Sequence, residues 1–163
     1  MPFADHNAML DPECVDITAR ILEVMGLEGV RRDNPQVKRG LKFIKESQEP
    51  DGSFYGRWGV NYIYGTCFAL RGLAAIGYDM TEGTCMQAAE WIRSLQNADG
   101  GWGETADSYH RPELRGIGPS TAAQTAWALM AIFATGDYYS ESAVRGVKYL
   151  LARQHGEIGR AHV

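Results

Sequence analysis

Three segments of the chain carry the same stripe of hydrophobic positions, and each ends near a glutamine, Gln48, Gln96 or Gln154. Apolar or small residues stand 4, 7 and 11 positions before every one of these glutamines. The members of the stripe are Ile44, Leu41 and Val37, then Ile92, Ala89 and Cys85, and finally Leu150, Val147 and Ala143. This spacing is typical of the buried face of an amphipathic helix. We therefore expect three helices that each expose one face to solvent.

Segments of a second kind alternate with these three. They read "DITARILEVMG", "YGTCFALRGLAAIG" and "STAAQTAWALMAIFATG", and they close with Gly26, Gly77 and Gly136. Glycine commonly follows the end of a helix. The latter two segments are apolar or small on nearly every side, as expected of helices that are buried on both sides. No run of β-branched residues with a period of two competes with them, so the sequence predicts an all-α fold.

The alternation of buried and exposed helices also predicts how they assemble. One inner and one outer helix per repeat suggest an α/α solenoid or a closed α/α (toroid) barrel. Three such pairs make up roughly half of a barrel and leave an apolar edge open, because every repeat needs a neighbour. We expect residues 1–156 to form this partial α/α-barrel domain.

The segments after the first two glutamines share one turn pattern, with Asp at the third position, Gly at the fourth and an aromatic residue at the sixth. The members are Asp51, Gly52 and Phe54 after Gln48, and Asp99, Gly100 and Trp102 after Gln96, with a second glycine at Gly101. Glycine permits a positive φ or a close backbone approach. The glutamine amide can hydrogen-bond unpaired backbone groups at a neighbouring helix end. With the aromatic ring stacked on the amide, the turn would tie neighbouring repeats together.

The third copy of this turn is lost after Gln154. The chain continues with "EIGRAHV" at Glu157–Val163, which is the translation of GAG ATC GGA AGA GCA CAC GTC. From its second base onward this is a widely used sequencing-adapter sequence. We therefore expect residues 157–163 to be a non-native, disordered tail without a functional role.

Composition and charge narrow the function classes. The 163-residue chain is 45% hydrophobic and 22% charged with a net charge of −4, which indicates a globular domain and no nucleic-acid binding. Three widely spaced cysteines, Cys14, Cys67 and Cys85, indicate buried reduced thiols rather than a disulfide framework or a zinc site. The opening residues lack the features of a signal peptide. The longest apolar run, Ala126–Ala134, is too short to span a bilayer, although attachment to one leaflet stays open.

Four segments, taken in order, resemble the bacterial squalene–hopene cyclases, a family of triterpene cyclases. The repeated turn resembles their QW motif, and "DGSFYGRWGVNYIYGT" (Asp51–Thr66) resembles a signature segment of the family. "DPECVDITARILE" (Asp11–Glu23) and "STAAQTAWALMA" (Ser120–Ala131) also match. The resemblance runs from about Phe3 to Gln154. It implies an internal, C-terminal-half piece of a longer enzyme, built as an α/α barrel around an apolar cavity.

In such enzymes a protonated Asp adds a proton to the terminal alkene of squalene, and ring closure follows as positive charge moves along the chain. The resemblance places Trp58 and Tyr64 in the cavity near that acid, and Asp11 and Asp16 among the carboxylates that support it. It further implies that Phe3 and Ala4 line the constriction of the substrate channel. Trp58 would also contact substrate, as would Asn61, which resembles the hopene-forming type. The sequence alone leaves other interpretations open. Trp58 and Tyr64 could be large aromatic residues that fill the core, and Asp11 and Asp16 could be helix caps, since Asp near a helix start usually is one.

Three departures from the family pattern matter. Arg20 stands where some relatives place a His that hydrogen-bonds the catalytic Asp, and Arg is not expected to give up a proton. Phe54 replaces the Trp of the first turn and lacks its indole N–H. The acid motif D-x-D-D does not occur in this chain. We therefore expect the chain alone to have no cyclase activity.

The resemblance implies squalene or a related polyprenoid as partner, with no metal or other cofactor. It also implies peripheral, monotopic attachment to the cytoplasmic face of the bacterial membrane and a possible homodimer. Other classes remain as alternatives. A non-enzymatic helical-repeat binding module would not depend on Trp58 or Tyr64. A protein prenyltransferase β-subunit would need Asp, Cys and His as zinc ligands, and an α/α-barrel glycosidase would need a pair of carboxylates.

Overall fold

The computed structural model describes residues 12–154. This part of the chain contains no β-strand, and its secondary structure consists of six α-helices and two short 3₁₀ segments. The helices are α1 (Val15–Leu27), α2 (Pro35–Glu46), α3 (Tyr62–Ala75), α4 (Gly83–Ser94), α5 (Ala122–Ala134) and α6 (Glu141–Arg153), with 3₁₀ segments η2 (Ala106–Tyr109) and η3 (Pro112–Leu114). The all-α prediction is confirmed.

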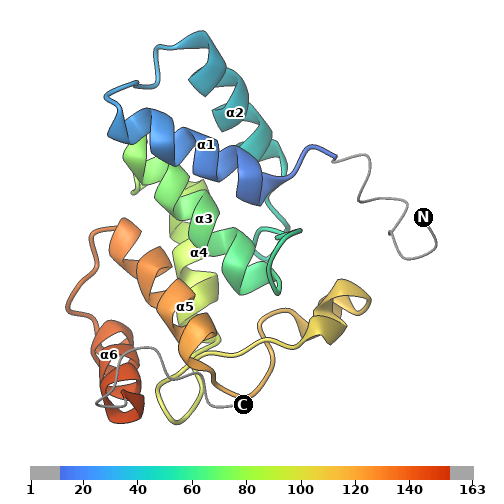
Figure 1. Ribbon diagram of the computed structural model, residues 1–163, viewed down its shortest axis with the longest axis vertical. Coiled ribbons are helices and arrows are strands. Elements are labelled where there is room, and N and C mark those ends of the chain that lie inside the picture. The colour runs from blue at the N-terminus through green and yellow to red at the C-terminus, as the bar shows by residue number, and fades with distance from the viewer. Residues whose placement is uncertain (1–11, 155–163) are drawn as a thin grey trace.

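The helices form two layers. α3 packs against α1 on one side and against α5 on the other, so these three make an inner layer, which faces the viewer in Figure 1. α2 packs on α1, α4 on α3 and α5, and α6 on α5. The inner α3 is buried along almost its whole length, whereas α2 buries only Val37 and Ile44. The predicted alternation of three inner and three outer helices is therefore confirmed.

Glycines let α1 and α3 cross at close range. A Cβ atom added at Gly26 would lie 2.4 Å from the carbonyl oxygen of Ala75, and one added at Gly72 would lie 2.5 Å from that of Ala19. The prediction that Gly26 ends its helix is wrong, because α1 continues to Leu27 and the positive φ of 83° belongs to Gly29. The small residue at position 26 is instead required by packing.

The other two inner helices end as the sequence predicts. Gly77 follows α3 with a φ of 73°, and Gly136 follows α5 with a φ of 81°. Both values lie in the left-handed region that glycine adopts without a steric penalty. Both helices therefore end two residues before the glycine, where the chain turns toward the following outer helix.

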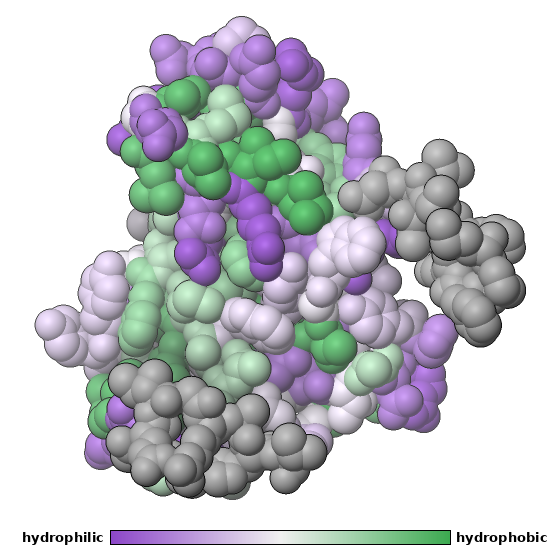
Figure 2. Space-filling model, in the orientation of Figure 1, coloured by the Kyte–Doolittle hydropathy of each residue, from purple (hydrophilic) through white to green (hydrophobic). Residues whose placement is uncertain are grey.

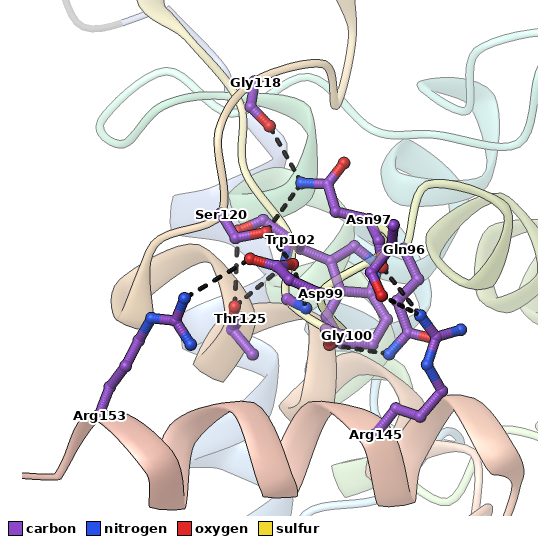
Figure 3. A network of polar contacts seen from close by, with 12 residues as sticks. Gln96, Asn97, Asp99, Gly100, Trp102, Gly118, Ser120, Thr125, Arg145 and Arg153 are labelled. Atoms are coloured by element: carbon purple, nitrogen blue, oxygen red, sulfur yellow. Dashed lines mark hydrogen bonds and ion pairs between the residues drawn. The ribbon is translucent and has the colours of Figure 1, made fainter.

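The second glutamine turn joins two repeats through hydrogen bonds to the backbone (Figure 3). The Nε2 atom of Gln96 donates to the carbonyl oxygen of Gly100 within the turn and to that of Ser142 at the start of α6, both at 2.9 Å. Trp102 is fully buried, and its indole N–H donates to the carbonyl oxygen of Ile92 at 2.7 Å. The turn thus ties α4, its own helix, to the next outer helix.

The first turn repeats this arrangement. Nε2 of Gln48 donates to the carbonyl oxygen of Gly52 at 3.0 Å and to that of Thr84 in the first turn of α4 at 2.8 Å. Phe54 is also fully buried, although its ring has no N–H to donate. The predicted link between repeats is confirmed in both copies, while stacking of the aromatic ring on the amide stays a prediction. Gln154 is exposed, and the turn that would follow it lies outside the described residues.

The glycine at the fourth position of each turn is doubly constrained. Gly52 and Gly100 have φ values of 94° and 88°. A Cβ atom at Gly52 would lie 2.8 Å from the carbonyl oxygen of Gln87 in α4, and one at Gly100 would lie 2.9 Å from that of Arg145 in α6. Both the left-handed backbone and the contact with the next outer helix therefore require glycine.

Replacing Gly72 tests the close crossing of α1 and α3. We expect Gly72→Ala to lower the free energy of unfolding by about 1–3 kcal/mol, because the added methyl overlaps the Ala19 carbonyl in a packed interface. The control is Gly83→Ala, since a Cβ atom there meets nothing within 4 Å. Urea unfolding followed by circular dichroism measures both variants. Equal midpoints for the two would contradict the crossing.

Replacing the turn glutamines tests the link between repeats. Gln96→Leu removes two hydrogen bonds and leaves buried carbonyls with fewer donors, so we expect a loss of about 1–3 kcal/mol in the free energy of unfolding. Gln154→Leu changes the same repeat position where the side chain is exposed, and we expect an effect within about 0.5 kcal/mol. Urea unfolding of both variants provides the comparison, and an equal loss in both would argue against the link.

Candidate active site

Asp16 joins the start of α1 to the loop that precedes α3. The residue is fully buried in the first turn of α1, and its Oδ2 atom accepts a hydrogen bond from the backbone N–H of Trp58 at 2.9 Å. Cys14 occupies the N-cap position of α1, where no side chain makes a capping bond. Asp16 is therefore not the helix cap that its position in the sequence would suggest. Its carboxylate instead holds the backbone of a residue more than 40 positions away.

Tyr64 lies beside this carboxylate in the first turn of α3. Its side chain is buried, with the rings of Phe68 and Trp127 edge-on at centroid distances of 4.9 and 5.0 Å. Its hydroxyl oxygen accepts a hydrogen bond from Arg20 at 3.0 Å, which leaves the hydroxyl proton available to another acceptor. Burial, together with the charge of Asp16, raises the pKa of Tyr64 against the opposing effect of Arg20. The hydroxyl is therefore a neutral donor at physiological pH.

Arg20 reaches this site from the exposed side of α1. Its guanidinium carbon lies 4.2 Å from the centroid of the Phe68 ring and 5.6 Å from that of Tyr64. An arginine guanidinium is a fixed positive charge in a protein. At the position where some relatives carry His, the structure thus has a permanent cation bound to the Tyr64 hydroxyl.

Trp58 does not fill the core. Its side chain is 52% exposed, while its backbone N–H is fixed by Asp16. The alternative that it serves as core filler is therefore wrong for the described residues. Tyr64, by contrast, is packed among aromatic rings and also has a polar partner. Its surroundings therefore agree both with a residue that fills the core and with a cavity residue near the acid.

Asn61 lies next to this site, but its side chain faces the loop backbone. It is fully buried at the N-cap position of α3, and its Oδ1 atom accepts a hydrogen bond from the N–H of Gly56 at 3.3 Å. Its predicted contact with substrate stays a prediction. The other predicted site residues, Phe3, Ala4 and Asp11, lie outside the described residues, as does the predicted tail at 157–163.

Glu104 is a site residue that the sequence analysis missed. Its buried carboxylate accepts three hydrogen bonds of 2.9–3.1 Å from the backbone N–H groups of Asn61, Tyr62 and Ile63. These are orphan donors at the start of α3, a helix that has no capping side chain of its own. A carboxylate here is also favoured by the helix dipole. The sequence feature that could have indicated this role is the position of Glu104 directly after the second turn, in "GGWGE".

The inner layer presents both apolar and polar surface. Figure 2 shows this face, with hydrophobic surface gathered over α1 and hydrophilic side chains just below it. The apolar part includes Ile21, Val24 and Leu27, all exposed on α1. The ionic part includes Arg71, which pairs with Glu23 of α1. The predicted open apolar edge therefore coincides with the first inner helix.

Among residues 12–154, no group of three or more His, Cys, Asp or Glu side chains could hold a metal ion. None of the helices in this part of the chain is long and apolar enough to cross a membrane.

The structure has three pairs of inner and outer helices, joined by glutamine turns, which is consistent with part of an α/α (toroid) barrel. The chain belongs to the squalene–hopene cyclase C-terminal domain family, whose model matches residues 1–160. This membership does not favour a helical-repeat binding module, a prenyltransferase β-subunit or a glycosidase.

Individual relatives agree with this assignment. The chain is 44% identical to the squalene–hopene cyclase of Zymomonas mobilis, over 96% of this chain and 24% of the relative. It is 45% identical to the squalene–hopene cyclase of Alicyclobacillus acidocaldarius, over 98% of this chain and 25% of the relative. It is also 44% identical to the dammaradiene synthase of Dryopteris crassirhizoma, over 94% and 26%. The chain thus spans about a quarter of the length of these relatives.

Replacing Glu104 tests its role at the start of α3. We expect Glu104→Gln to lower the free energy of unfolding by about 2 kcal/mol, because the amide loses the negative charge and turns a donor toward backbone donors. Glu113→Gln is the control, since this residue is exposed in η3. Thermal unfolding compares the two variants. A similar melting temperature for both would show that the carboxylate is not needed there.

Proposed function

We propose that this region forms part of the active-site wall of a triterpene cyclase of the isomerase or lyase type. Its substrate would be squalene or a related polyprenoid, converted to a polycyclic hopene-type product. The observation that carries the proposal is the meeting of Asp16, Arg20 and Tyr64 with the Trp58 loop at the N-terminal ends of α1 and α3. Membership of the cyclase family supports it.

The general acid would come from a segment of the longer protein, because this chain has no D-x-D-D string. That acid would give its proton to the terminal alkene and become a carboxylate, while the carbon skeleton takes up the positive charge. The charged Arg20 would stabilise the carboxylate without competing as a proton donor. The final carbocation would lose a proton to water, and a proton would return to the acid along a chain of waters in which the Tyr64 hydroxyl donates one proton and accepts another, so that it ends neutral.

Aromatic side chains would serve the cationic part of the reaction. Aromatic rings attract a cation through their quadrupole without attacking it as nucleophiles. Trp58 has an exposed ring on a loop whose backbone is bound to Asp16, so the ring would contact the reacting chain or shape its fold. The Phe68 ring is already engaged by Arg20 at 4.2 Å, and it would instead help to fix that cation.

The surroundings of the whole enzyme belong to the same proposal. We place the intact enzyme at the cytoplasmic face of the bacterial membrane as a peripheral protein, with a possible homodimer. An apolar polyprenoid substrate supports this placement, since it resides in lipid. The chain alone would be inactive, because three helix pairs do not enclose a cavity that excludes water from a carbocation.

A chimera tests the proposal. Residues 1–154 replace the matched region in the squalene–hopene cyclase of Zymomonas mobilis, and product formation from squalene is measured by gas chromatography. We expect an active chimera, in which Tyr64→Phe lowers kcat on the order of a hundredfold because the proton relay is lost. Trp58→Ala should lower kcat while leaving the melting temperature unchanged, because its ring is exposed rather than packed in the core.

Tyr78→Phe is the matched control for these variants. This buried tyrosine also loses a hydroxyl hydrogen bond, to Glu82 at 2.6 Å, but it follows the far end of α3. We expect it to change stability without changing kcat. A folded chimera without activity, or activities that fall only in proportion to the folded protein in all three variants, would refute the proposed function.

A further inference from the structure

The loop between the second turn and α5 is longer than its counterpart in the first repeat. The aromatic residue of each turn donates its backbone N–H to a threonine of the next inner helix. The partners are Phe54 and Thr66, 12 residues apart, and Trp102 and Thr125, 23 residues apart. The extra length forms η2 and η3, which project toward the loop before α3 in Figure 1. Insertions in repeat proteins often carry function.

This longer loop folds back onto the first repeat. Arg115 binds Glu49 at 3.0 Å and Asp51 at 3.2 Å, and its guanidinium carbon lies 4.6 Å from the centroid of the Tyr62 ring. At the other end of the loop, Glu104 caps α3. The loop is therefore anchored to the first repeat on both sides of η2.

Tyr109, the last residue of η2, contacts the backbone on either side of Trp58. Its hydroxyl donates to the carbonyl oxygen of Gly59 at 2.9 Å and lies 3.4 Å from that of Arg57. A phenol carries one proton, so the shorter contact is the hydrogen bond. The Tyr109 ring packs edge-on against Tyr55 at a centroid distance of 5.9 Å. Burial raises the pKa of Tyr109 to about 12, which keeps the hydroxyl protonated as a donor.

Trp58 is thereby held from two sides. Asp16 accepts its N–H, and Tyr109 binds the carbonyl of the next residue, Gly59. The indole itself is half exposed and lies outside the hydrophobic core, with the Arg57 guanidinium carbon 5.5 Å from its ring centroid. The point from which the indole leaves the backbone is therefore held by these two contacts.

From this geometry we propose that Tyr109 is a positioning residue for the Trp58 indole in the cyclisation reaction. The proposal rests on the proposed function, because it assigns to Trp58 a place beside the reacting chain. Tyr109 does not touch substrate. It acts by fixing the angle at which the indole face meets the developing cation, and small errors in such geometry cost rate rather than binding.

A double-mutant cycle in the active chimera tests this role. Tyr109→Phe keeps the ring and removes the hydroxyl, and we expect it to lower kcat about tenfold or more with KM nearly unchanged. In the Trp58→Ala background the same substitution should change kcat less than about twofold, because the residue it positions is gone. Tyr78→Phe is the matched control, with an equal loss of one tyrosine hydroxyl bond and no change in kcat.

The outcomes separate the two proposals. If Trp58→Ala leaves kcat unchanged, the proposed role of Trp58 fails, and the inference about Tyr109 fails with it. If Trp58→Ala lowers kcat but Tyr109→Phe behaves like Tyr78→Phe, only the positioning role is overturned. A full additional loss from Tyr109→Phe in the Trp58→Ala background would also overturn it, since Tyr109 would then act independently of the indole.

Discussion

The two hydrogens of a glutamine amide link each outer helix of this structure to the next one. Among the described residues, α2, α4 and α6 pack on inner helices and not extensively on one another. Gln48 and Gln96 each donate to their own turn and to the next outer helix. A side chain with two donors on one nitrogen suits this task. The adjacent glycines then let the two backbones approach. Arg145 of α6 adds hydrogen bonds to the second turn, at the carbonyl oxygens of Asn97 and Ala98.

Sequence periodicity was sufficient to predict this architecture. The stripe positions 4 and 11 residues before the first two glutamines are fully buried, as Ile44 and Ile92 show. In the third outer helix the prediction is wrong at Val147, which is exposed, because α6 buries Gly146 and Tyr149 instead. The uniformly apolar segments became the inner layer. The end of α1 was misplaced because a helix-ending glycine and a glycine required by close packing look alike in a sequence. Only the position of Ala75, nearly 50 residues away, distinguishes the two at Gly26.

The candidate site was predictable in its members but not in its connections. Family resemblance identified Asp16, Arg20, Tyr64 and Trp58, and the structure brings them together. The resemblance could not show that Arg20 binds a tyrosine hydroxyl. Nor could it show that Asp16 accepts a backbone N–H from another segment and does not cap its own helix. Glu104 and Tyr109 escaped notice because their partners lie in another repeat. A sequence records no distance between segments that far apart.

The Glu104 cap also limits how modular this chain can be. Repeat proteins are commonly divisible, because each unit needs only its immediate neighbour in order to fold. Here the loop between α4 and α5 supplies the carboxylate that completes the first residues of α3, and the same loop fastens the first turn through Arg115. Any duplication, deletion or exchange that separates the α4–α5 loop from α3 would therefore leave the start of that helix without its carboxylate. The first turn, the start of α3 and the α4–α5 loop must therefore be kept together when the sequence is rearranged.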